Sequence, residues 1–149
     1  MTPRTLCRGA TAFVVEAEAG RPLLDVLRSE LGLRSASRGC QDGSCGACRV
    51  LVDGALVASC RLAWGEVRDG ARLETYEDLA RDPAAARAVD AFAEERPSRC
   101  RMCVGALGVT AVAIAREGGK RGADAVEEAL EGATCMCTGR GSWRRALSK

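Results

Sequence analysis

The sequence predicts an α+β fold with two parts: a mixed domain over residues 1–78 and an all-helical domain over residues 79–149. Two observations support this division. Alternating apolar residues and an Asp-Gly turn lie in the first part, which is typical of strands and hairpins. Alanine-rich segments bounded by helix-start and helix-stop residues fill the second part. A chain of 149 residues has room for two such small domains.

The first elements predicted are a strand pair and a helix. Thr5–Cys7 and Thr11–Ala17 form the expected hairpin, because apolar residues alternate along the second segment and a turn fits between them. Pro22 suits the first position of a helix, and Gly32 suits its C-terminal cap. Between these two residues, leucines recur at four-residue spacing: Leu23, Leu27 and Leu31.

A second hairpin follows at Arg49–Val52 and Ala55–Cys60. Asp53-Gly54 separates the two strands, and this dipeptide between apolar runs is a strong signal for a two-residue turn. In the resulting register Cys48 lies opposite Ser59, so Cys60 lies one residue beyond the partner of Cys48. A last strand at Arg72–Thr75 completes the predicted sheet.

The second part is predicted to be a small helical bundle. Asp82 and Pro83 resemble an N-cap followed by a first helical proline, and Pro97 ends that helix after about Glu95. Three further helices are expected: Val104–Arg116 ending at Gly118-Gly119, a third from Asp124 to Gly132, and a short fourth after Ser142.

Cysteine spacing carries the chemistry of the first part. Cys40, Cys45 and Cys48 have the C-x4-C-x2-C spacing of plant-type iron–sulfur sites, and Cys60 supplies the fourth thiolate. Nearby glycines permit backbone N–H groups to approach sulfur: Gly39, Gly43 and Gly46. Structural zinc prefers paired C-x2–4-C knuckles, so an iron–sulfur cluster is favoured over zinc or core thiols.

A second cysteine set lies in the helical part: Cys100, Cys103, Cys135 and Cys137. Each pair falls at a predicted helix boundary, and a bundle can bring such boundaries together around a second metal site. Taken alone, this set also fits zinc. Cys7 is the ninth cysteine, and its place in a predicted strand favours a small buried side chain over a ligand.

Composition narrows the possible functions. A net charge of +2 and 3% aromatic residues favour neither a nucleic-acid footprint nor a base-stacking platform. Neither an apolar run of about 20 residues nor a signal-peptide core is present, so a cytoplasmic protein without a membrane span is expected. In that compartment nine cysteines indicate metal binding. The absence of histidine and of a catalytic triad predicts that the chain itself has no catalytic residues.

These motifs resemble the small iron–sulfur subunit of the molybdenum hydroxylase family, which includes xanthine dehydrogenase, aldehyde oxidoreductase and CO dehydrogenase. The order of strand pair, helix and further strands is that of a β-grasp, plant-type ferredoxin-like domain. The resemblance covers nearly the whole chain, and six segments carry it: Pro22–Gly32, Arg38–Cys48, Leu51–Cys60, Ala91–Glu95, Cys100–Cys103 and Cys135–Gly139.

The resemblance implies two [2Fe–2S] clusters, one per domain, with the two cysteine sets as ligands. It implies a large molybdopterin-binding subunit and a medium FAD-binding subunit, joined in a heterotrimer or a dimer of heterotrimers. The second-domain cluster would then lie nearer the molybdenum and the first-domain cluster nearer the flavin. The alternatives are a free two-cluster ferredoxin and a zinc-binding interaction module.

The resemblance also assigns residues near the pterin. Arg99 stands where the family usually has a pterin-contacting glutamine, and Cys137 matches the last cysteine, which also approaches the pterin. Arg101, Met136 and Arg140 depart from the usual residues of the same motifs. Arg99 and Cys137 are therefore the expected cofactor contacts of this chain, beside its eight metal ligands.

Overall fold

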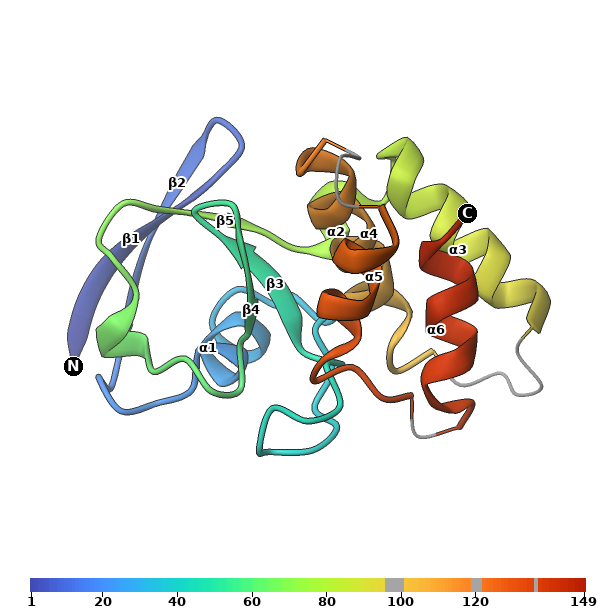
Figure 1. The fold of residues 1–149 in the computed structure, drawn as a ribbon. Coiled ribbons are helices and arrows are strands. Elements are labelled where there is room, and N and C mark those ends of the chain that lie inside the picture. Colours follow the sequence, from blue (N-terminus) through green and yellow to red (C-terminus); the bar gives the residue numbers. More distant parts are fainter. Residues whose placement is uncertain (96–100, 119–121, 136) are drawn as a thin grey trace.

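The structure is a computed structural model that describes residues 1–95, 101–118, 122–135 and 137–149. A sheet with one helix against it forms one side of the molecule, and a helical bundle forms the other (Figure 1). The α+β class is confirmed. Pro97 and Gly119, expected to end two helices, lie outside the described residues.

In the part of the chain that the structure describes, five strands make one mixed sheet in the order β2-β1-β5-β3-β4. Their bounds are β1 Thr2–Arg8, β2 Thr11–Ala17, β3 Arg49–Val52, β4 Ala55–Ala58 and β5 Ala71–Glu74. The central β1 and β5 run parallel, and the other pairs are antiparallel. Helix α1, Leu23–Ser29, and the short 3-10 helix η1, Trp64–Glu66, belong to the same side of the molecule.

The Asp53-Gly54 turn forms as predicted. Val52 pairs with Ala55 and Leu51 with Leu56. Asp53 and Gly54 have φ values of 50° and 82°, the left-handed values that a two-residue hairpin requires. Strand β4 ends at Ala58, two residues before the predicted end, because the chain turns there toward the cysteine loop.

The described residues of the helical side form five helices. They are α2 Tyr76–Leu79, α3 Pro83–Glu95, α4 Val104–Arg116, α5 Gly122–Leu130 and α6 Gly139–Leu147. Helix α6 begins before Ser142, the residue after which it was expected, because Thr138 and Gly139 already start the turn. The short α2 was not predicted, and it crosses the expected domain boundary between residues 78 and 79.

Three groups of buried residues form the core. One lies between the sheet and α1 and includes Leu27 and Trp64, and another lies among the helices and includes Phe92 and Trp143. A third joins the two sides, because Leu51 of β3 packs with residues of α2, α3 and α4: Leu79, Ala85, Val109 and Val112. This third group packs the β3–β4 hairpin, which lies between Cys48 and Cys60, against the helices.

An ion pair also joins the two sides. Arg116 of α4 donates to both oxygens of Glu74 in β5, at 2.8 and 3.0 Å. Arg116 holds the pKa of Glu74 below its ordinary value, against the effect of burial, and Arg72 adds to this effect. The pair therefore stabilises the fold while Glu74 is ionised.

We expect Arg116→Met to lower the stability of the chain by about 1 kcal/mol at pH 7, because the arginine is half exposed and water screens it. That change corresponds to about 2–4 °C in melting temperature. Since the folded pKa of Glu74 is depressed, the difference is full above the unfolded pKa of about 4.5. It shrinks as pH falls through the folded pKa. If the stability difference between Arg116→Met and the parent protein stayed the same down to pH 3, a role for the Glu74 carboxylate would be contradicted.

Candidate metal centres

The first cysteine loop runs from the end of the α1 region to the start of β3. Cys40, Cys45 and Cys48 line one pocket together with Cys60, which follows β4. The hairpin returns Cys60 to the loop: the Ser59 N–H and hydroxyl donate to the carbonyl of Cys48 at 3.4 and 2.6 Å. The structure therefore brings all four predicted thiols of the first set together.

Backbone N–H groups point at the sulfur atoms of this pocket. Cys40 and Cys45 each donate a backbone N–H to the other's Sγ at 3.3 Å. Ala47 donates to Cys45 Sγ at 3.4 Å, and Cys60 donates to Cys48 Sγ at 3.4 Å. Donors aimed at sulfur stabilise thiolates and tune the potential of a cluster that they bind.

Gly39 shows how closely the loop wraps these sulfurs. A Cβ at this position would lie 2.6 Å from Cys45 Sγ, so the backbone approaches sulfur as only glycine permits. Four thiols, directed N–H groups and this close backbone fit an anionic iron–sulfur cluster. Among the described residues, no three or more His, Cys, Asp or Glu side chains are grouped around a position for a single metal ion. In a [2Fe–2S] cluster the four cysteine ligands are divided between two irons.

The pKa values of the cysteine thiols in the first set shift in opposite directions. Burial opposes ionisation of Cys40, but N–H and side-chain hydrogen bonds from Cys45 lower its pKa to about 7. Burial and the neighbouring Cys48 raise the pKa of Cys60 to about 12. Burial likewise raises the pKa of Cys45. Because iron binds thiolates, loading of this site releases protons from Cys45 and Cys60.

The second cysteine set is partly described. Cys103 precedes α4, Cys135 precedes α6, and their Sγ atoms lie 3.6 Å apart in a buried environment. Burial opposes ionisation of Cys135, but hydrogen bonds from Thr138 and from the N–H of Cys137 lower its pKa. Cys137 itself is exposed. Cys100, together with Arg99 and Met136, lies outside the described residues.

The two cysteine loops touch each other. The N–H of Thr134, which directly precedes Cys135, donates to the carbonyl of Cys45 at 3.0 Å. Gly46 faces Gly132 so closely that a Cβ on Gly46 would lie 2.7 Å from the Gly132 carbonyl oxygen. Backbone of the first set therefore contacts backbone leading into the second set.

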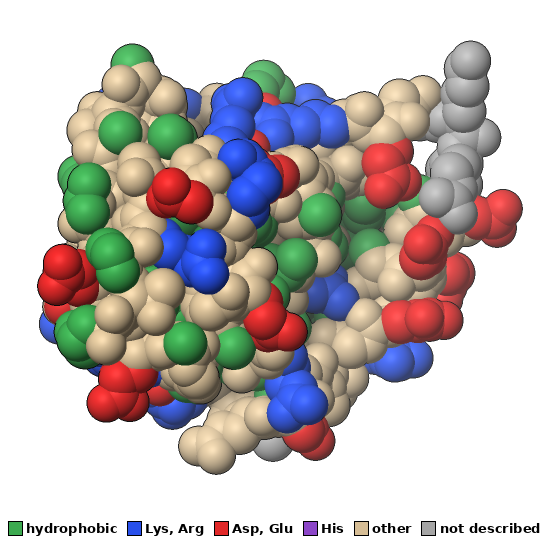
Figure 2. Space-filling model, turned by 90° about the vertical axis from the view of Figure 1, so that its left-hand side faces the viewer, with side chains coloured by type: hydrophobic (Ala, Val, Ile, Leu, Met, Phe, Trp, Pro, Cys, Tyr) green, Lys and Arg blue, Asp and Glu red, His purple; other side chains and the backbone are tan. Residues whose placement is uncertain are grey.

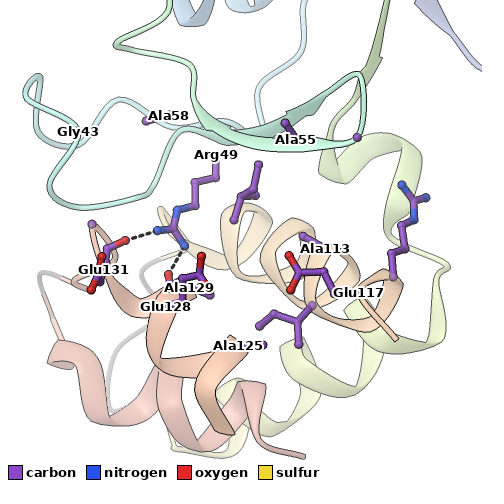
Figure 3. Close-up of a pocket in the computed structure, with 15 residues that line it drawn as sticks. Gly43, Arg49, Ala55, Ala58, Ala113, Glu117, Ala125, Glu128, Ala129 and Glu131 are labelled. Atoms are coloured by element: carbon purple, nitrogen blue, oxygen red, sulfur yellow. Dashed lines mark hydrogen bonds between the residues drawn. The ribbon is translucent and has the colours of Figure 1, made fainter. Parts of the chain in front are cut away.

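One buried residue of this region was not predicted as functional. Arg49 directly follows Cys48 and is the first residue of the strand predicted at Arg49–Val52. It is 8% exposed, and it lines a cleft between the β3–β4 hairpin and helices α4 and α5 (Figure 3). Its position after a ligand, in an otherwise apolar strand, is the signal that marks it.

Cys7, the ninth cysteine, lies in β1, where it is half-buried and does not line the pocket of the first set.

The surface carries charges of both signs. Positive and negative side chains are interspersed over the face shown in Figure 2, in keeping with a net charge of +2. Among the described residues, no helix combines the length and apolar character that crossing a bilayer requires.

The fold and the first site together define an iron–sulfur protein with a ferredoxin-like part. The 2Fe-2S iron-sulfur cluster binding domain family matches residues 8–81. The chain is 35% identical to the nicotine 6-hydroxylase small subunit of Paenarthrobacter nicotinovorans, over 84% of this chain and 74% of that protein. It is 34% identical to the xanthine dehydrogenase iron-sulfur-binding subunit of Escherichia coli O157:H7, over 85% of this chain and 80% of that protein.

Solved structures agree with these relatives. Quinoline 2-oxidoreductase from Pseudomonas putida matches with a TM-score of 0.81 and 29% identity, over 99% of this chain and 91% of that chain. Aldehyde oxidoreductase from Desulfovibrio desulfuricans matches with a TM-score of 0.81 and 27% identity, over 99% of this chain and 17% of that chain. The protein belongs to the family of iron–sulfur subunits of the molybdenum hydroxylases. It is an electron-transfer subunit of an oxidoreductase complex and not a free ferredoxin.

Proposed function

We propose that this chain passes single electrons from a molybdopterin cofactor in a large partner subunit, through two [2Fe–2S] clusters, to FAD in a medium partner subunit. Cys40, Cys45, Cys48 and Cys60 would hold the first cluster. Cys100, Cys103, Cys135 and Cys137 would hold the second. The observation that supports the relay best is the contact of the two loops at the Thr134–Cys45 hydrogen bond of 3.0 Å.

The division of labour follows from the residues present. A cluster accepts and returns one electron at a time, and the chain's own part is to bind each cluster, exclude water from it and set its potential. We assign substrate chemistry to the large subunit and no catalytic residue to this chain. The proposed domains are residues 1–78 for the first cluster and 79–149 for the second.

The proposed assembly is a heterotrimer or a dimer of heterotrimers in the cytoplasm. It is supported by relatives that are named small or iron-sulfur-binding subunits. We also propose that Arg99 and Cys137 lie near the pterin. Exposure of the Cys137 side chain leaves it accessible to a partner.

The test is metal analysis of the chain purified together with its neighbouring subunits. We expect about four iron and about four acid-labile sulfide per chain, and two distinct paramagnetic signals after reduction. Molybdenum and flavin should co-purify. Iron near two per chain, or stoichiometric zinc, would contradict the two-cluster assignment. Purification of the chain without molybdenum or flavin partners would contradict the relay.

A further inference from the structure

Arg49 is the first residue of β3, next to Cys48 of the first cysteine set, and its side chain extends toward the helical side of the molecule. Its guanidinium donates to the carbonyl of Ala129 and to the carbonyl of Glu131, both at 2.6 Å, and to the Thr110 hydroxyl at 3.3 Å. In Figure 3 the side chain points away from the sheet toward the last turn of α5. Each acceptor lies more than sixty residues further along the chain.

These hydrogen bonds orient Arg49 without neutralising it. All three acceptors are uncharged, and the guanidinium carbon lies 5.9 Å from the centre of the Trp143 ring, within the range of a cation–π contact. Arginine stays protonated in proteins, so a nearly buried positive charge remains here. A buried charge is costly unless negative charge lies nearby.

The acidic residues Glu128 and Glu131 line the same cleft as Arg49, and the first cysteine set is a further source of negative charge. Burial lowers the pKa of Arg49, whereas negative charge on Cys48 and Cys45 raises it. Cys48 is adjacent to Arg49 in the chain, and a cluster held by four thiolates is anionic. The carbonyls that Arg49 binds lie in the segment leading to Thr134 and Cys135.

We propose that Arg49 is a positioning residue for electron transfer. It fastens the first cysteine loop to the segment that leads into the second, and its fixed charge raises the reduction potential of the first cluster. Reduction adds one negative charge to a cluster, and a cation in a poorly hydrated environment stabilises that charge. This inference rests on the proposed relay, in which a higher potential at the first cluster draws the electron toward the flavin.

The experiment is a redox titration of the purified complex, followed through the paramagnetic signal of each cluster. Arg49→Met removes the charge and keeps a long side chain. We expect about a tenfold shift of the one-electron equilibrium away from the first cluster, which corresponds to about 59 mV. The second cluster's potential should shift less. Arg49→Lys keeps the charge without the guanidinium fork, so the first potential should stay closer to that of the parent.

Arg61 provides a matched control. It also directly follows a first-set cysteine, Cys60, but its side chain is exposed, so water and salt screen its charge. We expect Arg61→Met to leave both potentials near the parent values. Equal shifts in Arg49→Met and Arg61→Met would overturn the special role of the buried charge.

The remaining outcomes are also decisive. An unchanged first potential in Arg49→Met, with both clusters present, would overturn the proposal. If Arg49→Met and Arg49→Gln lose the first cluster while Arg49→Lys retains it, the result supports a requirement for positive charge at position 49. Loss in all three variants would reduce Arg49 to a structural contact and overturn its effect on potential. A parent complex without two cluster signals would instead refute the proposed relay itself.

Discussion

Cys45→Ser should abolish the paramagnetic signal of the first cluster and leave that of the second in place. Cys45 is 4% exposed, and its sulfur accepts N–H groups from Cys40 and Ala47 while Gly39 makes room for it. A serine oxygen is smaller and is a poorer iron ligand than a thiolate in a site shaped for sulfur. Iron should fall from about four to about two per chain.

Cys7→Ser is the matched control for this change. It makes the same substitution in β1, at a half-buried cysteine outside the first pocket, so both clusters should remain. In the complex, Cys45→Ser should slow reduction of the final acceptor much more than reduction of the molybdenum by substrate. Loss of both signals in a folded Cys45→Ser protein would contradict two separate ligand sets, and loss of neither would remove Cys45 from the ligands.

Local sequence determines much of the first site, which is why it could be predicted. The Asp53-Gly54 turn depends only on two residues that accept left-handed backbone, and it fixes the register that returns Cys60 to Cys48. Glycine at position 39 likewise reflects a close contact with Cys45 only a few residues away. Short-range geometry of this kind can be predicted from the order of residues.

Contacts between the two sides could not be predicted in the same way. The Arg49 hydrogen bonds to Ala129 and Glu131, and the Glu74–Arg116 ion pair, join residues that no local pattern links. The parallel pairing of β1 with β5 is another long-range contact. Such contacts depend on how the packed layers meet, and no local pattern in the sequence distinguishes Arg49 from an ordinary strand residue.

Gly46→Ala should disturb the junction of the two cysteine loops. Gly46 has φ of +76°, which costs alanine about 1–2 kcal/mol. A new Cβ would also meet the Gly132 carbonyl oxygen at 2.7 Å and Ala133 Cα at 3.1 Å, both of them backbone atoms that cannot rotate away. Overpacking of this kind typically lowers stability by roughly a further 1–3 kcal/mol.

Gly54→Ala separates these two effects. Gly54 has a similar φ of +82°, but nothing lies within 4 Å of its Cβ position, so alanine there meets only the backbone cost. With about 2–4 °C per kcal/mol, Gly54→Ala should lower the melting temperature of the cluster-loaded chain by about 2–8 °C and Gly46→Ala by about 4–20 °C, so Gly46→Ala should be the more destabilising of the two. Gly46→Ala should also weaken the magnetic coupling between the clusters, because the loops must separate. Equal melting temperatures for the two variants would show that the Gly46–Gly132 contact yields without cost and does not hold the loops together.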